Sequence, residues 1–135
     1  MRKIFTFLIL FCTLPFLSFS QTSKNSPCDT YITAEYIIDP QYHATPLQHG
    51  ETKQFTITFI GGNVYRLAVS SSTENNIHFM IYDQESNMLF SNADFKYAPY
   101  WDFDVTNTLE CTIKVSLVSP QTIEDFATIC IGFKQ

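Results

Sequence analysis

Apolar and polar residues alternate along most of the chain from residue 54 onward. Alternation with a period of two places every second side chain on the same face of an extended strand. Each run is therefore predicted to be a half-buried β-strand. The residues predicted to face a core are Phe55, Ile57, Phe59, Tyr65, Leu67, Val69, Ile77, Phe79, Ile81, Trp101, Phe103, Val105, Leu109, Cys111, Ile113, Val115 and Leu117.

Turn-forming residues separate these runs. Gly61 and Gly62 lie between two of them, where a tight hairpin turn would fit because glycine adopts positive φ without steric cost. Only residues 121–126 have a pattern that allows a helical turn, before a last strand at residues 127–133. Seven or eight short strands at this spacing predict one all-β domain at residues 28–135, an antiparallel β-sandwich.

The segment from Leu47 to Val118 resembles the small jelly-roll β-sandwich of bacterial pre-peptidase C-terminal domains. The resemblance lies in strand and turn motifs, which are His49-Gly50-Glu51, Phe55-Thr56-Ile57-Thr58-Phe59, Gly61-Gly62, Tyr65-Arg66-Leu67-Ala68-Val69, Phe79-Met80-Ile81-Tyr82-Asp83 and Tyr100-Trp101-Asp102-Phe103. It implies a jelly-roll fold and a role like that of adhesion or substrate-binding accessories of secreted enzymes. The last strand departs from the pattern, and the resemblance is to a stand-alone copy of such a domain.

Residues 1–20 have the pattern of a cleaved secretory signal peptide. Arg2 and Lys3 precede an uncharged apolar run, and small residues stand one and three places before Gln21. The run is interrupted and shorter than the roughly 20 apolar residues that span a bilayer, so an uncleaved anchor is a less favoured alternative. A lipoprotein is less favoured still, because neither Cys12 nor Cys28 follows the small-residue pattern that lipid attachment requires. We expect a secreted or periplasmic protein that begins at Gln21, with a loose leader at 21–27 and no stable membrane insertion after cleavage. The predicted signal peptide, with Gln21 at its cleavage site, is similar to those of secreted Bacteroidetes-type proteins.

The charge of the chain is acidic. Cleavage before Gln21 would remove two of the eight basic residues and none of the 13 acidic ones, so the formal charge would fall from −5 to −7. The remaining basic residues are scattered singly and form no patch for nucleic acid or an anionic lipid surface. We therefore expect no nucleic-acid partner.

Three cysteines follow the predicted signal peptide, at Cys28, Cys111 and Cys130. In an oxidising compartment they allow one disulfide, with three possible pairings. Cys111 shares the inward face of its predicted strand, whereas Cys130 faces away from the inward residues beside it, and bonded cysteines must point toward each other. We favour a Cys28–Cys130 disulfide with Cys111 buried and free, while a fully reduced set stays open.

No residue pattern predicts a catalytic site or a cofactor. The three histidines, among them His78, lack the spacing of zinc ligands, and the serines at 70–72 lack a nucleophile-elbow motif. Asp102 and Asp104 share one face of a strand, as carboxylates on a solvated surface commonly do. We expect a protein that is not an enzyme and has no cofactor. A small secreted hydrolase with a site assembled from dispersed residues is the alternative.

Asp83, Glu85 and Asn87 are a weak candidate for a metal site. Alternating oxygen side chains resemble the first half of a calcium loop, because hard cations need several oxygen ligands. Met88 stands where such a loop needs glycine, and Asp94 where it needs a longer glutamate. A polar hairpin turn explains the same residues, so no metal site is predicted.

The stretch 95–103 is rich in aromatic residues and contains Trp101, the single tryptophan of the chain. Trp101 is predicted to fill the core. Tyr97 and Tyr100 allow two interpretations, a cap over the rim of the core or a platform that stacks on sugar rings or apolar side chains. Pro99 would stiffen that platform and lower the ordering cost of binding. Tyr97, Pro99 and Tyr100 are thus the predicted binding residues.

These observations together predict a secreted, non-catalytic interaction module whose partner is a protein or a glycan. Assembly through pairing of exposed edge strands is a structural alternative. The sequence leaves the identity of the partner open.

Overall fold

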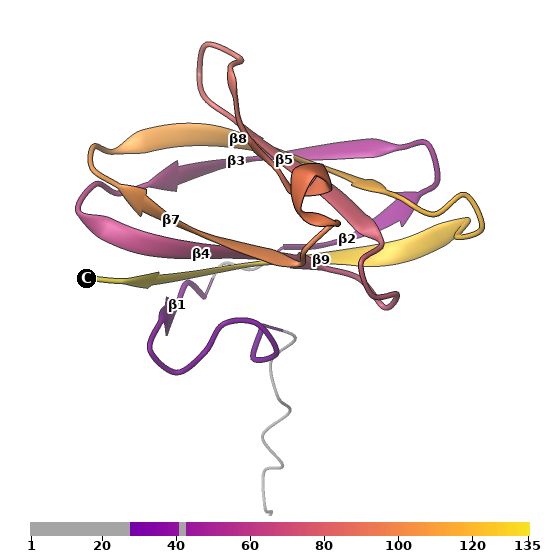
Figure 1. Ribbon diagram of the computed structural model, residues 1–135, viewed down its shortest axis with the longest axis horizontal. Coiled ribbons are helices and arrows are strands. Elements are labelled where there is room, and N and C mark those ends of the chain that lie inside the picture. The colour runs from indigo at the N-terminus through magenta and orange to yellow at the C-terminus, as the bar shows by residue number, and fades with distance from the viewer. Residues whose placement is uncertain (1–27, 41–42) are drawn as a thin grey trace, which may run out of the picture.

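The computed structural model describes residues 28–40 and 43–135, so the predicted signal peptide and leader lie outside the described residues. Two antiparallel sheets face each other in this part of the chain (Figure 1). Their strands are β1 (Ile37–Ile38), β2 (His43–Gln48), β3 (Thr52–Phe59), β4 (Asn63–Ser70), β5 (Ile77–Tyr82), β6 (Met88–Ser91), β7 (Tyr100–Val105), β8 (Leu109–Leu117) and β9 (Glu124–Lys134), with a short 3₁₀ helix, η1 (Asn92–Phe95), between β6 and β7.

The order of the strands is that of a jelly roll. The first sheet has the order β2-β9-β4-β7, with β1 beside β2 on the same edge of β9, and the second has the order β3-β8-β5-β6. From β2 onward each connection crosses to the other sheet, except the β5–β6 hairpin, and this path is the jelly-roll path. The predicted antiparallel β-sandwich is confirmed. The described residues form nine strands rather than seven or eight, because β1, β2 and β6 carry little or no alternation in the sequence.

The alternating residues fill the space between the two sheets, as predicted. Phe59, Leu67, Phe79 and Ile113 are fully buried there, and each buried side chain of this size stabilises the fold by roughly 1.5–3 kcal/mol. Trp101 is only half-buried and packs against this core from its edge. One edge of the core is therefore incompletely covered.

Two predictions about turns are wrong. Gly61 and Gly62 do not close a hairpin, because β3 and β4 belong to different sheets, and the loop carries the chain from one sheet to the other. Glycine is needed there for another reason. Gly62 has a φ of +87°, and a Cβ on Gly61 would lie 2.7 Å from the carbonyl oxygen of Thr106. The predicted helical turn at 121–126 is instead a tight turn followed by the start of β9.

The N-terminal strap, residues 28–38, lies against the outer face of the first sheet (Figure 1). Cys28 and Cys130 form a disulfide with their Cα atoms 5.5 Å apart, and Cys111 is buried and free. Gly132 of β9 lies directly beneath the strap, where a Cβ would be 2.7 Å from Cγ2 of Ile32. The strap thus covers part of the outer face of the first sheet.

Candidate functional site

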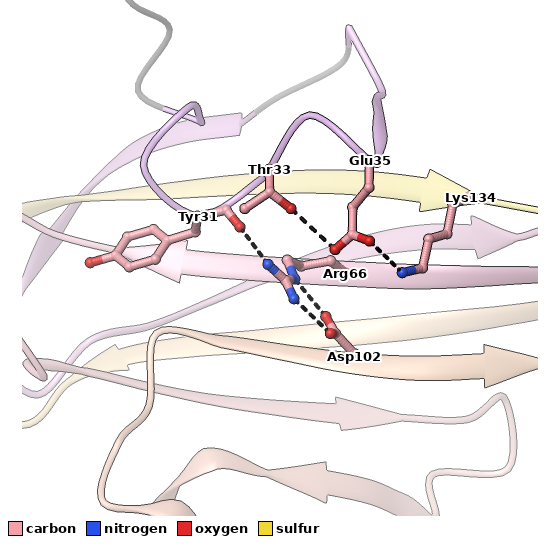
Figure 2. Close-up of polar contacts among 6 residues, drawn as sticks. All are labelled: Tyr31, Thr33, Glu35, Arg66, Asp102 and Lys134. Carbon is pink, nitrogen blue, oxygen red and sulfur yellow. Dashed lines mark hydrogen bonds and ion pairs between the residues drawn. The ribbon is translucent and has the colours of Figure 1, made fainter.

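Arg66 lies at the centre of a polar network on the outer face of the first sheet (Figure 2). Its guanidinium donates two hydrogen bonds to Asp102, from Nε to Oδ1 at 2.6 Å and from Nη2 to Oδ2 at 2.7 Å. A third bond, from Nη1, reaches the carbonyl oxygen of Tyr31 in the strap at 3.0 Å. The hydrogen bonds from Arg66 hold the pKa of Asp102 below its usual value, and those to Asp102 raise the pKa of Arg66.

The other charges of this network are also paired. Nζ of Lys134 in β9 lies 3.0 Å from Oε2 of Glu35, which belongs to the strap (Figure 2). The Arg66 guanidinium lies 4.3 Å from the centre of the Tyr100 ring, within the range of a cation–π contact. The network therefore fastens the strap to β4, β7 and β9, and it leaves few charges for a partner.

The structure separates Tyr97 from Tyr100, the two aromatic residues of the predicted binding site. Tyr100 begins β7 on the outer face of the first sheet and is 40% exposed. Tyr97 packs edge-on against the ring of His78, with 5.8 Å between the ring centres, and His78 lies on the outer face of the second sheet. Tyr97 and Tyr100 thus contact opposite faces of the sandwich.

The hollow beside Tyr97 is also small. Tyr97 and Pro99 border a space of about 10 Å³, which is the room that a single water molecule needs. The backbone carbonyl of Pro99 accepts a hydrogen bond from the N–H of Val69 at 2.7 Å. Pro99 therefore fixes the path of the chain into β7. A direct binding role for Tyr97 and Pro99 stays a prediction.

Three aromatic rings stack where the sandwich is open, between the edge strands β6 and β7. Phe90 comes from β6, Phe95 from η1 and Trp101 from β7, and their ring centres lie 4.3–5.6 Å apart. Neither strand has a hydrogen-bonded neighbour on this side among the described residues. Phe95 is 45% exposed, so the stack is in contact with solvent.

A groove of about 280 Å³ opens beside this stack. Most of its lining residues are apolar, among them Leu89, Phe90, Trp101 and Phe103. Leu89 is 51% exposed because the β5–β6 register shifts at this point and leaves it without a partner on β5. Trp101 also borders a second hollow, which Phe95 and Tyr100 line. We call the groove, the second hollow and the three stacked rings the edge surface.

The one charged residue that lines the groove is acidic. Asp104 lines it and forms no ion pair with any residue that the structure describes. Burial raises the pKa of the Cys111 thiol, which lies in the wall of the groove, to about 11, and the charges of Asp83 and Glu110 add to this shift. Hydrogen bonds from Asn87 lower the pKa of Asp83, so this carboxylate keeps its charge at neutral pH.

Comparison with known proteins supports the architecture. No protein-family model and no curated protein matches the sequence. Among solved structures, the chain is similar to Aeromonas hydrophila PliG, a periplasmic lysozyme inhibitor of g-type lysozyme. The TM-score is 0.55 and the sequence identity 10%, over 70% of this chain and 85% of that chain. The likeness is one of fold. No helix of the described residues is long and apolar enough to cross a membrane.

The weak metal candidate forms a closed polar turn between β5 and β6. Both carboxylate oxygens of Asp83 accept hydrogen bonds from Asn87, at 2.8 Å from its backbone N–H and at 2.9 Å from its side-chain amide. Glu85, the third candidate residue, is exposed in the same turn. Within residues 28–40 and 43–135, no group of three or more His, Cys, Asp or Glu side chains is placed to hold a metal ion.

His78 and Ser91 form a pair that the sequence pattern does not reveal. Nε2 of His78 lies 3.0 Å from Oγ of Ser91, a distance typical of a base and a nucleophile. Such a pair needs a third group that orients the base, and no described carboxylate is hydrogen-bonded to His78. Asp102 is held by Arg66 on the other sheet. The Ser91 hydroxyl also accepts a hydrogen bond from the backbone of Ala93 and so caps η1. The pair was missed because β6 was not predicted.

Proposed function

We propose that the protein is a secreted or periplasmic, non-catalytic module that binds another protein through its edge surface. The observation that carries this proposal is the solvent-exposed stack of Phe90, Phe95 and Trp101 beside an apolar groove. Contiguous exposed apolar surface marks sites of interaction on soluble proteins. Aromatic side chains also supply much of the energy at protein interfaces.

The fold and the predicted signal peptide support the same function. A. hydrophila PliG, which has a similar fold, is described as an inhibitor of a lysozyme, so its target is a protein. A g-type lysozyme is therefore the first partner to test. The pattern of residues 1–20 supports export from the cytoplasm. The resemblance to pre-peptidase C-terminal domains agrees with an accessory binding role and stays a prediction.

A protein partner fits the edge surface better than a glycan does. Sugar rings can stack on aromatic faces, but their hydroxyl groups also need hydrogen-bonding partners. Apolar side chains form most of the groove, and Asp104 is the one charged residue among those that line it. An apolar side chain of a protein would fill this space without unpaired polar groups.

Site-specific photo-crosslinking tests the proposal. A photoreactive amino acid is placed at Leu89, in the groove, and separately at Ile123, which is 80% exposed and not among the residues lining the groove. Each photoreactive variant is incubated with the secreted and periplasmic proteins of its source organism, and separately with purified g-type lysozyme. We expect one protein, identified by mass spectrometry and confirmed by titration of the purified components, to crosslink at position 89 only. Equal crosslinking at both positions, or binding to a glycan array that depends on Phe95, would contradict a protein site here.

The His78–Ser91 pair allows a test of the hydrolase alternative, because it identifies Ser91 as the candidate nucleophile. An activated serine reacts with a fluorophosphonate probe, whereas a serine that caps a helix does not. We expect no labelling of the folded protein. Labelling that is lost in Ser91→Ala and in His78→Ala would favour the hydrolase.

A further inference from the structure

The groove of the edge surface has the size and lining of a pocket for a side chain. Its volume of about 280 Å³ is just below the range of about 300–1,000 Å³ typical of ligand pockets. Leu89 and Trp101 form two of its apolar walls. The strap lies on the outer face of the first sheet and does not line this groove. An apolar side chain from another molecule would therefore be desolvated without displacing a described segment.

The charge that lines this pocket is negative. Asp104 lines the groove and has no ion-pair partner among the described residues. Glu110 extends from the opposite face of β8 and lines a different hollow, together with Asp83 and Lys114. The nearest basic side chain along this strand is Lys114, whose Nζ lies over the ring of Tyr82, 4.6 Å from its centre. The one charged residue that lines the pocket, Asp104, is acidic and forms no ion pair with a described residue.

The rest of the molecule strengthens this field. All 13 acidic residues lie in the described part of the chain, together with five basic residues. Three of those five, Lys53, Arg66 and Lys134, are neutralised in ion pairs. A strongly acidic molecule attracts cationic partners over long range and repels a second copy of itself.

From these observations we infer that the partner presents an apolar side chain flanked by lysine or arginine residues. The apolar side chain occupies the groove beside Trp101, and a flanking cation faces Asp104. This inference rests on the proposed function and specifies the chemistry of the partner. Complementary charge of this kind steers association and selects among partners.

Trp101 supplies the readout, because it is the only tryptophan of the chain and lines the groove. Three capped peptides serve as probes: KKLKK, which is apolar and basic, EELEE, which is apolar and acidic, and KKSKK, which is basic without an apolar side chain. We expect KKLKK to change the fluorescence of Trp101 at the lowest concentration. We also expect this affinity to fall as salt rises from 50 to 500 mM.

Two substitutions separate the apolar and the charged contributions. Asp104→Asn should lower the affinity for KKLKK by about twofold to fivefold, which is the contribution of one partly exposed ion pair. Leu89→Lys should abolish its binding, because it fills the groove and adds a positive charge. Ile123→Lys makes the same change of charge at an exposed position that does not line the groove, and should leave binding within about twofold of wild type. Circular dichroism of each variant shows whether the fold is retained.

Several results would overturn this inference. They are equal binding of EELEE and KKLKK, equal binding of KKSKK and KKLKK, no response to any probe, or a normal response in Leu89→Lys. The proposed function fails separately, when no protein crosslinks at position 89. A protein that crosslinks there, but binds Asp104→Asn and wild type equally at all salt concentrations, leaves the function standing and refutes the cationic partner.

Discussion

Arg66 and Asp102 lie opposite each other on β4 and β7 and form a two-point ion pair on the outer face of the first sheet. The same guanidinium bonds to the carbonyl of Tyr31, so one arginine holds both the edge strand β7 and the strap. The strand that carries Trp101 into the edge surface is thus fixed from its other face.

This ion pair predicts a pH dependence of stability. The hydrogen bonds from Arg66 lower the pKa of Asp102 from its usual value of 3.8 in the folded state. A group with a lowered folded-state pKa contributes stability above its unfolded pKa, and this contribution is lost as pH falls through the folded value. The Asp102 side chain is 40% exposed, so the contribution should be below about 1 kcal/mol.

The measurement is the urea midpoint between pH 2 and pH 7. Asp102→Asn should be less stable than wild type at pH 7 and should converge with it as the pH falls below 4. Asp104→Asn is the matched control, because Asp104 is exposed on the same strand and has no described ion-pair partner. If both variants show the same pH profile, Asp102 has no special part in acid stability.

Among the polar residues near the edge surface, Asn92 should be the one whose substitution destabilises the fold most. It is fully buried, its Oδ1 accepts the backbone N–H of Phe79 at 2.9 Å, and its Nδ2 donates to the carbonyls of Ile77 and Ala98. Asn92→Ala would leave these three groups without partners, and each unpaired buried group costs about 1–3 kcal/mol. Chemical denaturation with Trp101 fluorescence measures the loss.

Asn92→Asp is the informative companion to this variant. The carboxylate has the shape of the amide and can still accept from Phe79, but it cannot donate to Ile77 and Ala98. We expect a loss of stability that is partly relieved at low pH, when the carboxylate is protonated. An unchanged denaturation midpoint in both variants would show that the loop at η1 does not depend on Asn92.

The alternation in the sequence was sufficient to predict the sandwich and its core, since the inward residues of β4, β5 and β8 are buried, with the one exception of the half-buried Leu109 at the start of β8. It did not show which strands pair, because a period of two is identical for neighbours in one sheet and for partners across the core. Gly61 and Gly62 illustrate this point: a turn motif between two strands fits a hairpin and a crossing between sheets equally well. Short edge strands such as β6 were missed because the residues from Met88 to Phe90 do not alternate.

The edge surface was predicted only in part, for the same reason. The sequence singled out the aromatic stretch and Tyr100, which borders the second hollow. It did not join this stretch to Leu89 and Phe90, because that contact depends on the order of strands in two different sheets. Tyr97 was grouped with Tyr100 by closeness in sequence, whereas the chain between them passes from one face of the sandwich to the other.

Phe79 tests the predicted core directly. Its side chain is fully buried between the sheets, and truncation of such a residue leaves a cavity. Phe79→Ala should lower the free energy of unfolding by about 3–5 kcal/mol. Phe126→Ala is the matched control, since Phe126 is 58% exposed on β9 and should change stability by less than about 0.5 kcal/mol. Equal effects of the two substitutions in thermal denaturation would contradict the register of these strands.

The cysteines allow a prediction that joins covalent chemistry to the strap. In the chain from Gln21 onward, Cys28 and Cys130 are bonded and Cys111 is free. Burial raises the pKa of Cys111 to about 11, so it stays a protonated thiol at pH 8 and reacts slowly with alkylating reagents. We expect no labelling of the native protein by iodoacetamide at pH 8, and one labelled cysteine after unfolding without reductant. Two more should become labelled when reductant is added.

Removal of the disulfide should release the strap and destabilise the fold. The bond joins residues 102 positions apart, and cross-links of this span stabilise by about 2–5 kcal/mol. In the Cys28→Ser, Cys130→Ser double variant, we expect that loss together with faster hydrogen exchange at Ile32 and Tyr36, while the core strand β8 keeps its relative protection. Cys111→Ala controls for the loss of a cysteine that holds no bond. Three labelled cysteines in the unfolded, unreduced wild type would show that the disulfide does not form, and would remove the covalent anchor of the strap.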